Sequence, residues 1–157
     1  SSAASDVYKR QTQSIITGNT GWYKQGTKLA TWPAIQRLQK QADSLVTFGV
    51  HTNRMHYLVD HGIPVFNIPA NYTRFKRDYA VSQDVLKEKV GYKSPIFTYP
   101  YGSGDSQIQK FLANRPGLKV ILTLNDGLVT NHSNLKLTPR IIVNNYSWPS
   151  ITKWINN

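Results

Sequence analysis

Two histidines, His51 and His56, are the residues whose type and spacing point most directly to chemistry. They stand five positions apart, directly after the apolar run Val46–Val50. On a continuous helix, histidines that share a zinc ion stand four apart, so a spacing of five needs a turn to aim both imidazoles at one point. The chain has no cysteine, so any metal site must use His, Asp or water. The spacing alone also fits two unrelated surface histidines.

A second segment, FTYPYG at 97–102, places a proline-fixed turn and a flexible glycine directly after a β-prone run. Taken alone, this pattern is equally typical of a strand that ends in a tight turn with two packed tyrosines. Its interest comes from its combination with the histidine segment.

Alternating β-prone runs and amphipathic helices must position these two segments. The expected strands are 14–17, 46–50, 96–99, 120–124 and 140–143, and the expected helices are 31–42, 72–90, 105–115 and one that starts near 147. Repeated βα units predict an α/β fold with a parallel sheet, whose functional residues gather where strands end. His51 and Pro100 both follow strand ends, so we expect one shared pocket.

Length and charge limit the other classes of protein. The 157 residues fit one domain, and no apolar run reaches the length of a membrane span. The formal net charge of +11 indicates a polyanionic neighbourhood, either nucleic acid or an anionic surface. The basic residues are scattered and no recognition motif is present, which disfavours a nucleic-acid-binding domain. We expect a monomer without a nucleic-acid partner.

The first eleven residues, SSAASDVYKRQ, are polar and without periodicity, and they resemble translated sequencing-adapter DNA. A non-native or disordered leader is therefore expected at 1–11, followed by the folded domain at 12–157.

The order of segments resembles the polysaccharide deacetylases of carbohydrate esterase family 4, over about residues 12 to 155. The resemblance is closest to the branch that deacetylates poly-N-acetylglucosamine. The matching segments are the strand at 14–17, LATW at 29–32, HTNRMH at 51–56, the helix that contains Asp78, FTYPYG at 97–102 and PRI at 139–141.

This resemblance implies a distorted (β/α) barrel and a divalent cation, usually zinc, held by one Asp and two His. His51 and His56 match the two histidines, and Thr52 matches the residue that supports their loop. Two histidines and a carboxylate would also suit cobalt or nickel.

The resemblance also implies that Tyr101 donates its backbone N–H to the oxyanion, within a substrate-binding segment formed by Tyr99, Pro100, Tyr101 and Gly102. Arg140 matches a basic position that contacts the catalytic base or the substrate. A surface salt bridge is the competing interpretation of Arg140.

Three departures from the family pattern affect these expectations. The first motif, Thr-Phe-Asp-Asp-Gly, which supplies the catalytic base and the Asp ligand, is absent. We therefore expect a barrel incomplete at its N-terminal strand and helix, a third ligand outside this chain, and a fragment inactive alone. Thr98 stands where many members carry Arg. No Leu-x-His motif follows Arg140, so the general acid stays unassigned; His132 is the histidine that lies near that end of the chain.

The sequence thus predicts a hydrolase of non-peptide carbon–nitrogen bonds that removes N-acetyl groups from a cell-surface or cell-wall amino-sugar polysaccharide. The expected location is extracellular or at the surface of a bacterium, with a signal or anchor upstream. The alternative is a non-catalytic carbohydrate-binding relative of the deacetylases.

Overall fold

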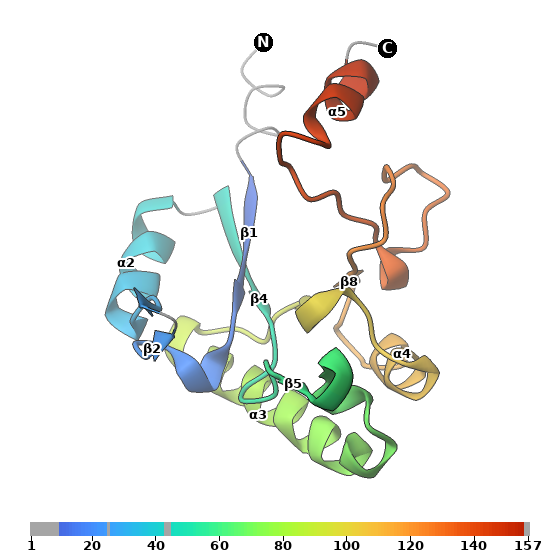
Figure 1. Cartoon of the computed structure of the whole chain (residues 1–157). Coiled ribbons are helices and arrows are strands. Elements are labelled where there is room, and N and C mark those ends of the chain that lie inside the picture. Colours follow the sequence, from blue (N-terminus) through green and yellow to red (C-terminus); the bar gives the residue numbers. More distant parts are fainter. Residues whose placement is uncertain (1–9, 25, 43–44, 156–157) are drawn as a thin grey trace.

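The computed structural model describes residues 10–24, 26–42 and 45–155. Its main sheet has four parallel strands in the order β1-β4-β7-β8 (Figure 1). The strands are β1 (Gln11–Ile15), β4 (Val46–Val50), β7 (Ile96–Thr98) and β8 (Val120–Leu122). The α/β class and the parallel sheet predicted from the sequence are confirmed. Among the described strands the sheet is open, with β1 and β8 at its edges.

A helix connects each pair of neighbouring strands, as parallel pairing requires. These helices are α2 (Trp32–Ala42), α3 (Tyr72–Val90) and α4 (Ser106–Ala113). A last helix, α5 (Trp148–Ile155), is drawn at the top of Figure 1.

Short elements fill the connections between these strands and helices. Two hairpins pair β2 (Tyr23–Lys24) with β3 (Thr27–Lys28) and β5 (Leu58–Val59) with β6 (Ile63–Pro64). The 3₁₀ turns are η1 (Thr17–Asn19), η3 (Asp60–Gly62), η4 (Val65–Asn67), η5 (Pro69–Asn71), η6 (Pro100–Gly102) and η7 (Leu135–Leu137).

The long helix α3 covers one face of the sheet and carries much of the core. Its buried face includes Phe75, Tyr79, Ser82 and Leu86, which recur at helical spacing. The Phe75 ring lies 6.1 Å from that of Phe97 on β7, in the edge-to-face arrangement that aromatic rings favour. The helix ends where the sequence predicted, because Gly91 adopts a left-handed φ of 90°.

Two strand predictions need correction. The first strand begins at Gln11 rather than Ser14, whereas Thr17 lies in η1. The strand predicted at 140–143 does not form, and a single bridge joins Thr138 to Leu122 instead. These β-branched residues have no partner strand among the described residues, and Ile142 remains 58% exposed. The β propensity of a residue reflects how its side chain packs against neighbouring strands, so a β-branched segment without such neighbours need not form a strand.

Gln11 pairs with Val46, so β1 starts one residue before the predicted domain boundary. Residues 1–9 of the predicted leader lie outside the described residues. No described helix combines the length and apolar character needed to cross a membrane.

The aromatic core gives a test of the fold. Phe75→Ala should lower the free energy of unfolding by about 3–5 kcal/mol, because it leaves a cavity among Phe66, Phe97 and Phe111. Urea unfolding followed by circular dichroism measures the change. Val81→Ala, on the exposed side of the same helix, is the control and should change stability by less than about 1 kcal/mol. Equal effects of the two variants would contradict this description of the core.

Candidate functional site

His51 lies at the C-terminal end of β4 and is held from both neighbouring strands. Its backbone N–H donates to the Ile15 carbonyl at 2.9 Å, and its Nδ1 lies 2.7 Å from the Thr98 carbonyl oxygen. A carbonyl can only accept, so Nδ1 carries the proton and donates it to Thr98. In the neutral form of the ring, this tautomer has its lone pair on Nε2, the nitrogen that can then bind a metal.

His56 lies beside His51 and beside Tyr101. The two imidazole centroids are 4.8 Å apart, and the His56 and Tyr101 ring centroids are 4.9 Å apart. The Tyr101 hydroxyl is 3.4 Å from His56 Nδ1. The structure thus brings the histidine segment and the 97–102 segment to one edge of the sheet.

The loop that joins the two histidines contains a strained residue. Thr52 has a φ of 68°, a left-handed conformation that a β-branched residue rarely adopts. Its side chain is fully buried, and its hydroxyl has no hydrogen-bond partner among the described residues. Strain of this kind persists only where the surroundings enforce it, and it concentrates at functional sites.

Asp78 is a positioning residue for this loop. It projects from α3, and its carboxylate accepts the backbone N–H groups of Asn53 at 2.7 Å and Arg54 at 2.8 Å. Burial raises the pKa of Asp78, against the opposing effects of these two hydrogen bonds and of the Arg74 charge. In the sequence, Asp78 is recognisable only as part of a helix that matches the family pattern. The feature that could have indicated its role is the position of a carboxylate on the apolar face of α3, because a buried acid needs hydrogen-bond partners.

The 97–102 segment divides between core and surface. The Tyr99 side chain is 1% exposed and packs edge-to-face on Phe97, and Pro100 and Gly102 are buried as well. Tyr101 is exposed and has a φ of 59°. Its backbone N–H donates to no acceptor in the part of the chain that the structure describes.

The side chain of Tyr99 therefore belongs to the core, where burial raises the pKa of its phenol. Partial burial also raises the pKa of the Tyr101 phenol, so both hydroxyls are neutral at physiological pH.

Arg140 lies beside the residues that follow β8. Its Nε donates to the Thr123 carbonyl at 2.6 Å, and its backbone N–H donates to the Asn125 carbonyl at 3.0 Å. Burial lowers the pKa of this guanidinium. No ion pair with a described acidic side chain accompanies it, so the competing interpretation, a surface salt bridge, finds no partner within the described residues. Arg140 fixes the backbone after β8.

Across residues 10–24, 26–42 and 45–155, no group of three or more His, Cys, Asp or Glu side chains gathers as a complete metal site. His132, considered above for the general acid, is exposed in a turn where its backbone N–H donates to the Thr130 hydroxyl.

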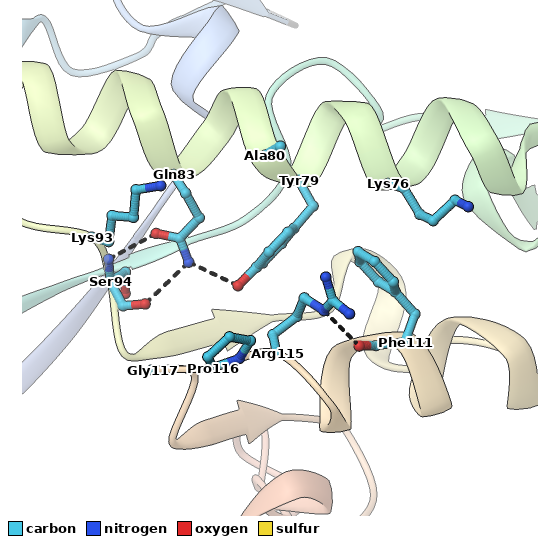
Figure 2. Close-up of a pocket in the computed structure, with 10 residues that line it drawn as sticks. All are labelled: Lys76, Tyr79, Ala80, Gln83, Lys93, Ser94, Phe111, Arg115, Pro116 and Gly117. Carbon is cyan, nitrogen blue, oxygen red and sulfur yellow. Dashed lines mark hydrogen bonds between the residues drawn. The ribbon is translucent and has the colours of Figure 1, made fainter.

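A cavity of about 390 Å³ lies elsewhere, between α3 and the loop that follows α4 (Figure 2). Gln83, Tyr79 and Ser94 form a hydrogen-bonded group in its wall, and Lys93 and Arg115 flank it. The cavity shares no residue with the histidine segment or the 97–102 segment, so its size does not identify it as the chemical site.

The fold matches known structures along nearly its whole length. IcaB from Ammonifex degensii aligns with a TM-score of 0.81 and 26% identity, over 97% of this chain and 64% of that one. A de-N-acetylase from Aggregatibacter actinomycetemcomitans aligns with a TM-score of 0.73 and 14% identity, over 98% of this chain and 68% of that one. The BpsB deacetylase domain from Bordetella bronchiseptica gives 0.70 and 19%, over 90% and 64%.

No protein-family model matches the sequence, and no curated protein does so either. The structural matches nevertheless define the class, a mixed α/β protein with the fold of deacetylase domains. These matches support the resemblance to the poly-N-acetylglucosamine deacetylases that the sequence indicated. It spans about two thirds of the length of these relatives.

The support of the histidine loop by Asp78 can be tested directly. Asp78→Asn removes one acceptor oxygen and leaves a backbone N–H of the loop unpaired, which should cost about 1–3 kcal/mol of stability. It should also shift the NMR signals of the His51 and His56 rings.

Asp84→Asn is the matched control on the same helix. Asp84 pairs with Lys93 at the surface, so its loss should cost less than about 1 kcal/mol and leave both imidazole signals in place. If Asp78→Asn left the histidine signals unchanged, its assigned positioning role would be wrong.

Proposed function

We propose that this chain supplies the histidine ligands and part of the substrate site of a metal-dependent hydrolase that removes N-acetyl groups from an amino-sugar polysaccharide. The observation that carries the proposal is the convergence of His51 and His56 beside Tyr101 at the C-terminal edge of a sheet with a deacetylase fold. In α/β proteins this edge is where functional groups from separate strands meet.

The chemistry of the two imidazoles fits a divalent metal, for which zinc is the expected identity. The Thr98 carbonyl fixes the tautomer of His51, so its Nε2 would be the ligand atom. The Tyr101 hydroxyl lies 3.4 Å from Nδ1 of His56, and Nε2 is the proposed ligand atom of that ring. The resemblance implies an aspartate as the third ligand. We propose that this aspartate and the catalytic base come from outside the described residues.

The residues of this chain would then orient the acetamide and stabilise the charge that develops on it. A metal bound at the histidines would polarise the acetamide carbonyl and lower the pKa of a bound water. The positive φ of Tyr101 accompanies a backbone N–H that no described acceptor uses. This N–H is the proposed donor to the carbonyl oxygen as it becomes an oxyanion. Thr52 would support the loop that holds both histidines through its carbonyl, which accepts the N–H of Thr17.

The remaining parts of the 97–102 segment act indirectly in this proposal. Tyr99, Pro100 and Gly102 are buried, so they would position Tyr101 rather than contact the sugar. Arg140 would fix the backbone beyond β8 at the rim of the site.

The proposed partner is an acetylated amino-sugar polymer at or outside a bacterial cell surface, with the enzyme acting as a monomer. The net charge of +11 would favour residence near an anionic cell wall. The names of two structural neighbours support the removal of an acetyl group as the reaction, since one is a de-N-acetylase and the other a deacetylase domain.

The metal assignment predicts a specific loss in two variants. Zn²⁺ titration should shift the NMR signals of the His51 and His56 rings together. His51→Ala or His56→Ala should weaken Zn²⁺ binding more than about tenfold, because losing even a hydrogen-bond partner of a ligand lowers metal affinity about 10–100-fold. His132→Ala is the control and should bind Zn²⁺ like the wild type, because His132 is exposed in a separate turn. Unchanged affinity in His51→Ala would end the ligand assignment.

Catalysis requires a separate measurement. A protein that carries this chain together with the missing carboxylate ligand should release acetate from β-1,6-linked N-acetylglucosamine oligomers, and His51→Ala should abolish the release. Oligomer binding without acetate release would instead support the alternative, a non-catalytic carbohydrate-binding relative.

A further inference from the structure

The structure separates the aromatic residues that could meet a sugar from those that form the core. Trp22 is 54% exposed and Tyr23 is 73% exposed, whereas Tyr99 is 1% exposed. Trp22 precedes the β2–β3 hairpin, which follows η1 at the end of β1. A large apolar side chain left half exposed on a structured turn is available to a ligand.

This turn is fixed to the loop between the two histidines. The N–H of Thr17 donates to the Thr52 carbonyl at 3.2 Å, and the N–H of Gly18 donates to the Asn53 carbonyl at 3.0 Å. The contact is so close that a Cβ at Gly18 would stand 2.7 Å from the Asn53 carbonyl oxygen. Glycine is therefore required there, and the two loops form one unit.

Trp22 is held by the same unit. Its N–H donates to the Asn19 carbonyl at 3.1 Å, and its carbonyl accepts the N–H of Leu29 at 2.8 Å. The Arg54 guanidinium lies over the indole, 5.7 Å from the ring centroid, in a cation–π contact. The backbone of Arg54 is in turn held by Asp78. The indole thus has a fixed orientation, which lowers the entropy cost of binding a ligand.

The order of the strands places Trp22 and Tyr101 on opposite sides of the histidines. Trp22 lies on the β1 side, the histidine segment follows β4, and Tyr101 follows β7. Since these strands are neighbours in that order, the C-terminal edge presents an aromatic ring, the two imidazoles and a second aromatic ring in sequence. Such a row suits a linear polymer better than a single sugar.

We propose that Trp22, oriented by Arg54, is a sugar-stacking subsite for a unit of the polysaccharide next to the one whose acetamide reacts. The inference rests on the proposed function, because it uses the same substrate class. One face of a pyranose ring presents C–H groups, which pack on an aromatic face much as another apolar ring does. An acetylated amino-sugar polymer is uncharged, so the role of Arg54 is to hold the indole rather than to pair with the ligand.

The subsite makes binding depend on oligomer length. In isothermal titration with the hexamer of β-1,6-linked N-acetylglucosamine, Trp22→Ala should raise the Kd about five- to tenfold, as expected for one aromatic contact. Binding of the monosaccharide should not change, because a single unit at the histidines does not reach Trp22. Trp22→Phe should recover most of the hexamer affinity.

Trp148→Ala is the matched control, because Trp148 is 52% exposed, nearly as much as Trp22, but lies on α5. It should bind the hexamer like the wild type. Circular dichroism checks that each variant is folded. Equal hexamer affinity of Trp22→Ala and wild type would overturn the subsite and leave the proposed function standing. Absence of hexamer binding by the wild-type chain would overturn both the substrate class and the subsite.

Discussion

The carboxylate of Asp78 is the interaction on which the arrangement of this edge depends. It is buried beneath the loop at 51–56, and it accepts two consecutive backbone N–H groups from that loop. Burying a carboxylate is unfavourable unless hydrogen bonds compensate, and here the compensating donors belong to the segment that carries both histidines. Because the buried carboxylate needs these two donors, its hydrogen bonds hold the loop against α3. The same contact fixes the backbone of Arg54, which orients Trp22.

Strain and hydrogen bonds are balanced around the two histidines. Thr52 and Tyr101 both adopt a left-handed φ, and they lie in the two segments that meet at the site. A hydrogen bond holds the residue next to each strained one. His51, before Thr52, is hydrogen-bonded to the Thr98 carbonyl, and the carbonyl of Gly102, after Tyr101, accepts the N–H of Leu124. A backbone conformation that is unfavourable by itself is thus maintained by the sheet on either side.

The two faces of the sheet have different roles. Val50, Phe97 and Ile121 pair across the strands and face the helices, where they form the aromatic and aliphatic core. Ser14 and Thr98 lie on the opposite face, and their hydroxyls are 2.7 Å apart. Thr98 therefore makes two contacts, through its hydroxyl to Ser14 on that face and through its carbonyl to His51.

The sequence by itself determined the class of fold and the two segments of the site. Helical spacing defined the buried face of α3, and strand–helix alternation placed His51 and Tyr101 at strand ends, because both patterns are local and repeat along the chain. Only the tertiary structure decided what depends on distant neighbours. It put Tyr99 in the core, left Ile142 without a strand partner, and joined Asp78 and Trp22 to the histidine loop. These outcomes follow from contacts between residues far apart in the sequence, which no local pattern encodes.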